Sequence, residues 1–186
     1  MPSGWFLLAF VMFSLSGVTY ALDNKAKAPK PEAYTSEAGR FSVSVAGKVS
    51  TDAKQIAYGA NPEQTVSRTT SKWDALPSGT YSVTYADYPE AFKGLAETLL
   101  DGARDGVKGP DGLGGTVQSE KPVEVPGPDD AKVAGREVVV KARKNWVRVR
   151  LVVVELRLYQ VMVTGTEEGV NSDAAKHFLD SFRLTK

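Results

Sequence analysis

Alternation of apolar and polar residues predicts strands along most of the chain. The segments 41–45 and 81–85 alternate with the two-residue period of a half-buried strand, and the looser stretch 64–73 also favours a strand. Four further strand-like runs follow, at 116–125, 135–143, 146–153 and 157–164. The last three runs are joined by very short connections, which force neighbouring strands to lie antiparallel because a parallel return needs a long crossover.

A first amphipathic helix is predicted in the middle of the chain. Asp87 is a suitable capping residue and Pro89 is tolerated in a first turn, so we expect the helix to start there and to end at 106–110, where Gly and Pro accumulate. Its apolar stripe follows the 3.6-residue period: Phe92, Leu95, Ala96, Leu99, Leu100 and Ala103.

A second amphipathic helix is predicted at the end of the chain. Asn171 and Ser172 supply its cap, and the stripe behind them consists of Ala175, Phe178, Leu179 and Phe182. Strands grouped in a meander, with helices between and after them, are typical of an α+β domain. We therefore expect an antiparallel β-sheet of about six strands flanked by helices.

The N-terminal part of the chain divides before the first strand. Residues 1–21 are predicted to be a cleaved signal peptide, because the apolar run 5–18 is shorter than the ~20 residues of a membrane span and is followed by small residues. An uncleaved anchor is the open alternative, since no Lys or Arg precedes the run and three Lys follow it. Residues 22–39 are predicted to be a flexible linker, and residues 40–186 a single domain.

Composition narrows the chemistry that the domain can perform. The chain has 186 residues, no Cys and one His, which excludes a disulfide framework, a Cys nucleophile and a multi-histidine metal site. A catalytic triad would have to use His177 with Ser181 and Asp173 or Asp180, but one exposed helix face lacks the oxyanion hole that acyl transfer needs. We expect no enzymatic activity, no catalytic residue, no cofactor and no metal.

Positive charge is concentrated in one predicted hairpin. The 23 Lys and Arg nearly balance the 22 Asp and Glu, which argues against nucleic-acid binding, yet the segment 136–157 holds seven basic and two acidic residues. Strand alternation places four cations on the face opposite the Val side chains: Lys141, Arg143, Arg148 and Arg150. These residues are the predicted site for an anion or a partner. The alternative is internal neutralisation by Glu120 and Glu124, or by the acidic residues of the first helix.

Five short segments occur in an order that resembles the PsbP-like (PsbP/Mog-type) family. They are Phe41-Ser42-Val43, Asp87-Tyr88-Pro89, Gly135-Arg136-Glu137, the run 157–161 and the run 178–182. The resemblance covers residues 40–186 and is that of a secreted bacterial member. It implies an antiparallel sheet between helical layers, an α-β-α sandwich, and a non-enzymatic role of docking onto a larger partner, with no functional residue carried over.

These observations together predict a secreted or periplasmic, non-enzymatic binding or accessory domain. Its expected partner is a protein or a polyanionic component of the cell envelope, bound through the basic hairpin face. The alternative function is that of a membrane-tethered envelope accessory protein, held by an uncleaved segment within residues 1–21.

Overall fold

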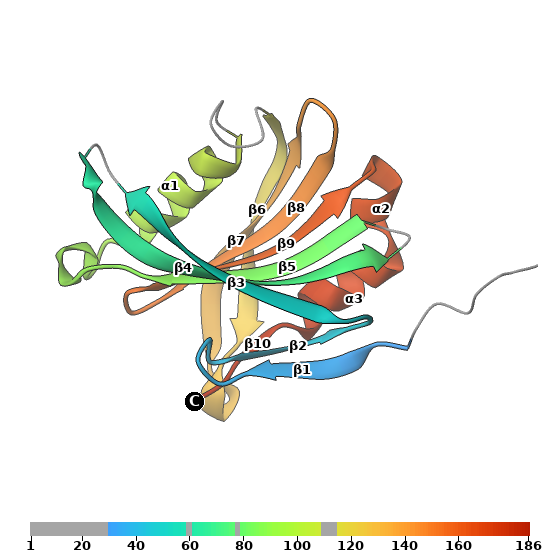
Figure 1. Ribbon diagram of the computed structural model, residues 1–186, viewed down its shortest axis with the longest axis horizontal. Helices are drawn as coiled ribbons and strands as arrows, with labels where there is room; N and C mark the ends of the chain where they lie inside the picture. Colours follow the sequence, from blue (N-terminus) through green and yellow to red (C-terminus); the bar gives the residue numbers. More distant parts are fainter. Residues whose placement is uncertain (1–29, 59–60, 77–78, 109–114) are drawn as a thin grey trace, which may run out of the picture.

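The computed structural model describes residues 30–58, 61–76, 79–108 and 115–186, and its centre is a large antiparallel sheet (Figure 1). Seven strands form this sheet in the order β3-β4-β5-β9-β8-β7-β6. Their bounds are β3 Val49–Tyr58, β4 Asn61–Leu76, β5 Gly79–Asp87, β6 Thr116–Pro126, β7 Lys132–Lys141, β8 Trp146–Val154 and β9 Arg157–Gly165.

The remaining elements form two layers, one on each face of the large sheet. Helix α1 (Ala96–Lys108) packs on β7 and β8. The other face is covered by α2 (Glu167–Asn171), α3 (Asp173–Ser181) and a three-stranded sheet. The three strands of that small sheet are β1 Glu32–Ser36, β2 Phe41–Val45 and β10 Arg183–Leu184. Two short 3₁₀ turns are η1 Glu90–Phe92 and η2 Pro128–Asp130. The α+β class and the antiparallel sheet predicted from the sequence are confirmed.

Two cores follow from the alternation of side chains on β8 and β9. Val147, Val149 and Leu151 are fully buried against α1. Residues of the opposite parity belong to the second core, in which Phe178 of α3 makes edge contacts with Tyr81 at 5.0 Å and with Trp73 at 6.1 Å. Buried aromatic pairs of this kind add to the free energy gained from area burial alone. The apolar stripe of α3 therefore fixes this helix on the sheet.

The expected helix start at Asp87 is wrong. β5 continues through Asp87, whose carboxylate accepts hydrogen bonds from Arg157 at 2.5 and 2.6 Å instead of capping a helix. The chain then passes through η1 and through Gly94, which has a φ of +76°, before α1 begins at Ala96. Leu95 is consequently 45% exposed rather than part of the buried stripe.

The expected linker at 22–39 is also wrong in its second half. Residues 32–36 form β1, which pairs antiparallel with β2. The ring of Tyr34 packs edge-on against Trp73 at 5.1 Å, so burial of one aromatic side chain holds this strand in place. Residues 22–29 and the predicted signal segment 1–21 lie outside the described residues. Within the described ranges, none of the helices has the length and apolar character needed to cross a membrane.

We predict that two glycine-to-alanine substitutions change stability in opposite directions. A Cβ on Gly135 of β7 would lie 2.5 Å from the backbone oxygen of Leu151, so Gly135→Ala should lower the free energy of unfolding by about 1–3 kcal/mol. A Cβ on Gly102 of α1 would meet no atom within 4 Å, so Gly102→Ala should raise it by roughly 0.5–1 kcal/mol. Urea denaturation measures both, and a Gly135→Ala variant as stable as the parent would contradict the register of β7 with β8.

Candidate functional site

Three of the four cations predicted to share the hairpin face lie on the face opposite the buried Val side chains. Arg148 and Arg150 alternate with Val147 and Val149 on β8 as expected. Lys141 ends β7 and lies over the ring of Trp146, 5.5 Å from its centroid. Arg143 does not join them, because β7 stops at Lys141 and a turn closed by the hydrogen bond from Ala142 N to Asn145 O, at 2.8 Å, carries Arg143 away.

The two arginines of β8 are paired within the domain. Glu137 of β7 is 2% exposed and accepts hydrogen bonds from Arg148 at 2.7 Å and from Arg150 at 2.8 Å. Arg150 also donates to the backbone oxygen of Leu179 at 2.8 Å and to Asp180 at 2.5 Å, which joins the sheet to α3. Burial alone raises the pKa of Glu137, but the hydrogen bonds from Arg150 and Arg148 outweigh it and hold that pKa below its ordinary value.

Internal neutralisation extends to the opposite face of the sheet. Arg136 forms ion pairs with Glu97 and Asp101 of α1 and with Glu120 of β6. Glu124 pairs instead with Lys132, at 2.9 Å. The acidic residues of α1 and Glu120 thus neutralise Arg136, and not the cations of the hairpin face for which the sequence offered them. Anion or partner binding by Lys141, Arg143, Arg148 and Arg150 stays a prediction, and two of these side chains would have to leave carboxylates to perform it.

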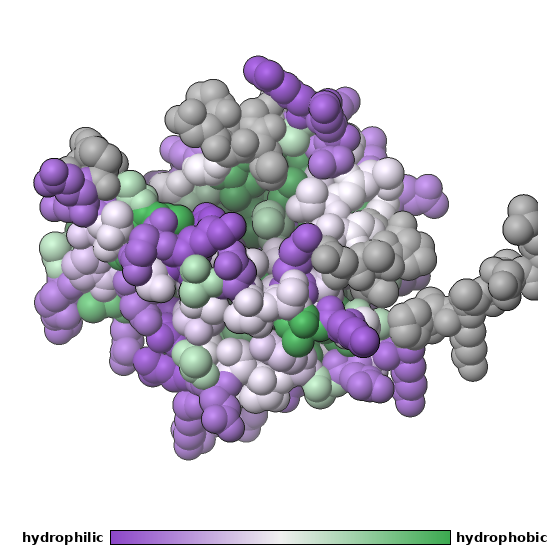
Figure 2. All heavy atoms as spheres, in the orientation of Figure 1, coloured by the Kyte–Doolittle hydropathy of each residue, from purple (hydrophilic) through white to green (hydrophobic). Residues whose placement is uncertain are grey.

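A different feature of the surface is a groove between α1 and the sheet. It has a volume of about 690 Å³ and lies where β3, β4 and β9 pass beyond the area that α1 covers. Figure 2 shows this face hollowed, with apolar side chains inside and hydrophilic ones along β3 and β4. We call it the α1 groove; its lining includes Ile56, Tyr58, Arg68, Tyr88, Phe92, Leu99, Gly102, Gly106, Val107, Gln160 and Met162.

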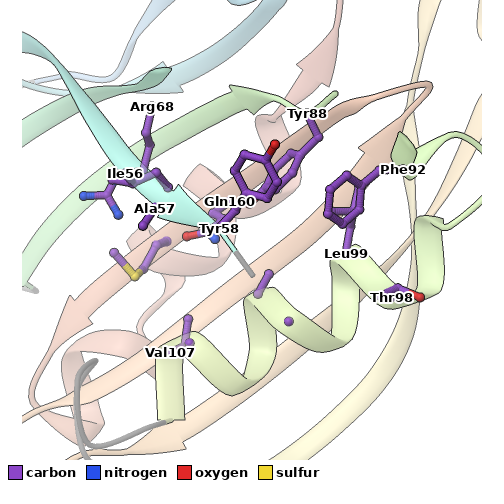
Figure 3. A pocket seen from close by; sticks show the side chains of 14 residues that line it. Ile56, Ala57, Tyr58, Arg68, Tyr88, Phe92, Thr98, Leu99, Val107 and Gln160 are labelled. Carbon is purple, nitrogen blue, oxygen red and sulfur yellow. The ribbon is translucent and has the colours of Figure 1, made fainter. Parts of the chain in front are cut away.

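Aromatic side chains close one end of the α1 groove. Tyr58 at the end of β3 lies edge-on to Tyr88 at 6.1 Å and to Phe92 at 5.6 Å, and Tyr88 lies 5.4 Å from Phe92 (Figure 3). The 3₁₀ turn that replaces the expected helix start is what brings Phe92 to this cluster. Three rings held edge to face give a rigid apolar wall.

The helix side of the α1 groove has little side-chain bulk. Gly102 and Gly106 both line the groove, and a Cβ on either would meet no atom within 4 Å. Leu99, three residues before Gly102, and Val107, which follows Gly106, are buried. The groove is therefore open along the part of α1 that presents its backbone.

A few polar groups converge on this apolar space. Arg68 of β4, Gln160 of β9 and the Tyr88 hydroxyl line the groove, and in the part of the chain that the structure describes none of the three has a hydrogen-bond or ion-pair partner. Burial raises the pKa of Tyr88, and the positive charge of Arg68 opposes part of that rise. Arg68 also borders a second hollow of about 250 Å³, lined by Ser50, Asp52, Lys54, Thr70 and Lys72.

No protein-family model matches the chain, and no curated protein does. Among solved structures, the chain is similar to the solution structure of cyanobacterial PsbP (CyanoP) from Synechocystis sp. PCC 6803. The TM-score is 0.49 and the sequence identity 11%, over 90% of this chain and 99% of that one. A similarity of this size carries no argument about partners or activity, and the α+β architecture is established by the strands and helices themselves.

The sequence did not indicate the α1 groove, because its lining comes from several segments between Ile56 and Met162 that only the sheet order brings together. One local signal was present. Gly102 and Gly106 stand one turn apart in a helix otherwise free of Gly within its described bounds, and so mark a face where bulk is absent. His177, the centre of the triad considered above, is exposed and contacts Ser44 Oγ at 3.3 Å. No group of three metal-ligating side chains occurs among the described residues.

We predict that Glu137→Gln lowers the free energy of unfolding by about 3 kcal/mol at neutral pH, because it leaves buried guanidinium groups without their carboxylate. Because the pKa of Glu137 is lowered in the folded state, ionisation of this carboxyl stabilises the fold at pH values above the ordinary glutamate pKa of about 4.3. This contribution to stability is lost as the pH falls through the pKa of the folded state. The difference between parent and variant should therefore shrink below about pH 4.

Chemical denaturation across pH measures this difference. The matched control is Glu124→Gln, whose partner Lys132 and own carboxylate are both largely exposed, and it should have little effect. Equal destabilisation by the two variants would contradict the assignment of Glu137 as the buried centre of the ion cluster.

Proposed function

We propose that this chain is an exported, non-enzymatic accessory domain that binds a component of the cell envelope or of a larger partner in the α1 groove. The observation that carries the proposal is the combination of an apolar hollow of about 690 Å³ with three polar side chains that lack partners among the described residues. Ligand sites have this composition, an apolar lining with few convergent polar groups, and volumes of about 300–1,000 Å³.

The types of polar group in the α1 groove favour binding over catalysis. A guanidinium is permanently protonated, and a carboxamide neither accepts nor releases protons near neutral pH. The third group is the Tyr88 hydroxyl, whose raised pKa keeps it protonated at neutral pH. Arg68, Gln160 and Tyr88 can therefore hold and orient a ligand, but they contain no general base to activate a nucleophile.

Export is supported by the apolar run 5–18, which has the length of a signal peptide core. This function is the binding or accessory role that the sequence predicts, but the binding surface is the α1 groove in place of the basic hairpin face. The basic hairpin face is the weaker candidate, because Arg148 and Arg150 already form ion pairs with Glu137.

A neutral apolar dye, N-phenyl-1-naphthylamine, tests the proposal without reference to charge. We predict that the chain recovered from the exported fraction enhances the dye fluorescence, and that Gly102→Leu, which fills the space above α1, weakens dye binding at least tenfold. Gly102→Ala is the matched control: it adds one methyl group at the same position and should retain binding. No enhancement by the parent chain, or equal binding by the Leu variant, would refute the α1 groove as the site.

A further inference from the structure

We infer that the ligand of the α1 groove is a monomeric single-chain amphiphile with an acidic head group, its apolar chain lying along α1 and its anionic head at Arg68. The inference rests on the proposed function and specifies the ligand. It depends on what lies at the two ends of the groove, an aromatic wall at one and a basic region at the other.

The apolar end suits a chain without polar groups. Tyr58, Phe92 and Leu99 line it, and the open backbone at Gly102 and Gly106 continues the hollow toward Val107. Each methylene that leaves water for such a surface strengthens binding by about fourfold. A chain of several methylenes therefore supplies the affinity, and the open space above the glycines has room for it along α1.

The charge at the other end selects an anion. Arg68 is half-buried and has no carboxylate within ion-pair distance among the residues that the structure describes. Its neighbours around the adjoining hollow are Lys54, Lys72 and a single carboxylate, Asp52, which is paired with Lys54 at 3.1 Å. A guanidinium removed in part from water and left without a counter-ion is costly, and an incoming carboxylate or phosphate removes that cost.

A neutral donor completes a place for the head group. The Gln160 carboxamide lines the same groove as Arg68 and also lacks a hydrogen-bond partner within the described ranges. A carboxylate has about four acceptor sites, which a guanidinium fork and an amide can share. Figure 3 shows Arg68 and Gln160 on the strand side of the groove, with the Arg68 guanidinium beside Ile56 and Ala57.

The surface favours a single amphiphile over a bilayer. Only two large apolar side chains are exposed in the described part of the chain, Val49 and Leu95, and they do not form a continuous patch with which to enter a membrane. Figure 2 shows apolar side chains inside the groove, and those outside it on this face stand apart from one another. An amphiphile must therefore leave its bilayer or micelle and bind as a single molecule.

Displacement of the dye by decanoate and by decan-1-ol, which share one chain length and differ in the head group, tests this inference. We expect decanoate to displace the dye at a concentration at least tenfold lower than decan-1-ol. Arg68→Gln should weaken decanoate binding at least tenfold and leave decan-1-ol unchanged, and Arg68→Lys should restore part of the loss. Arg183→Gln, an exposed position on β10, is the matched control and should change neither.

Three outcomes would overturn the inference. If decanoate and decan-1-ol displace the dye equally and Arg68→Gln has no effect, the ligand does not need an acidic head group, although the groove is still the site. Binding of the chain to phosphatidylglycerol vesicles without dye displacement by free decanoate would assign the anion to a membrane surface. A parent chain that does not bind the neutral dye would overturn the proposed function as well. Gly106→Leu provides a second variant if Arg68→Gln does not fold: it should weaken both amphiphiles equally.

Discussion

A single helix, α1, packs on one face of the seven-stranded sheet and is too narrow to cover it. The rest of the structure depends on how the uncovered part of that face is formed. Strands lie about 4.8 Å apart, so seven span about 29 Å, whereas a helix with its side chains is about 10–12 Å wide. Helix α1 covers β7 and β8 and cannot also reach β3 and β4. The opposite face has no such deficit, because α2, α3 and the small sheet all pack on it.

The uncovered strands meet this constraint with a change of side-chain chemistry. On β5 the face toward α1 carries Ser82 and Thr84, which are buried, and Thr84 shares a hydrogen bond with Thr70 of β4 at 3.0 Å. Small polar residues replace the apolar ones that β8 presents to α1. The α1 groove forms at the border between this polar area and the apolar area beneath α1, which gives it one apolar end and one basic end.

Regular alternation and helical periodicity were enough to predict β2, β5, β7–β9 and α3 and the antiparallel sheet, because these elements bury one face and so carry the pattern in their own residues. β4 and β6 were predicted from weaker patterns, and Val125 is the one buried residue of β6. β3 carries almost none of it, since most of its side chains are exposed. The start of α1 and the strand β1 depended on contacts made elsewhere, Asp87 with Arg157 and Tyr34 with Trp73. The sequence showed a cluster of cations, but Glu137 is placed between them by the register of β7 with β8.

The α1 groove, the proposed binding surface, was the least predictable part for the same reason. Its residues come from β3, β4, η1, α1 and β9, and only the strand order places them together. The number of charges along the chain pointed to Arg148 and Arg150 as a binding site. A better indicator of such a site is a cation that has no carboxylate partner in the folded structure. Arg68 stands alone in its segment and was unremarkable in the sequence, yet it is the cation without a carboxylate partner among the described residues that faces an apolar groove.

A two-dimensional ¹H–¹⁵N NMR titration of the protein with decanoate tests the central claim most directly, since it reports the position of the ligand without a substitution. We predict chemical-shift changes at the amides of Gly102, Gly106 and Gln160 and along the neighbouring parts of β3 and β4. The amides around Arg143, Arg148 and Arg150 in the hairpin of β7 and β8 should not shift. Changes confined to residues around Arg143, Arg148 and Arg150, or no changes at all, would contradict it.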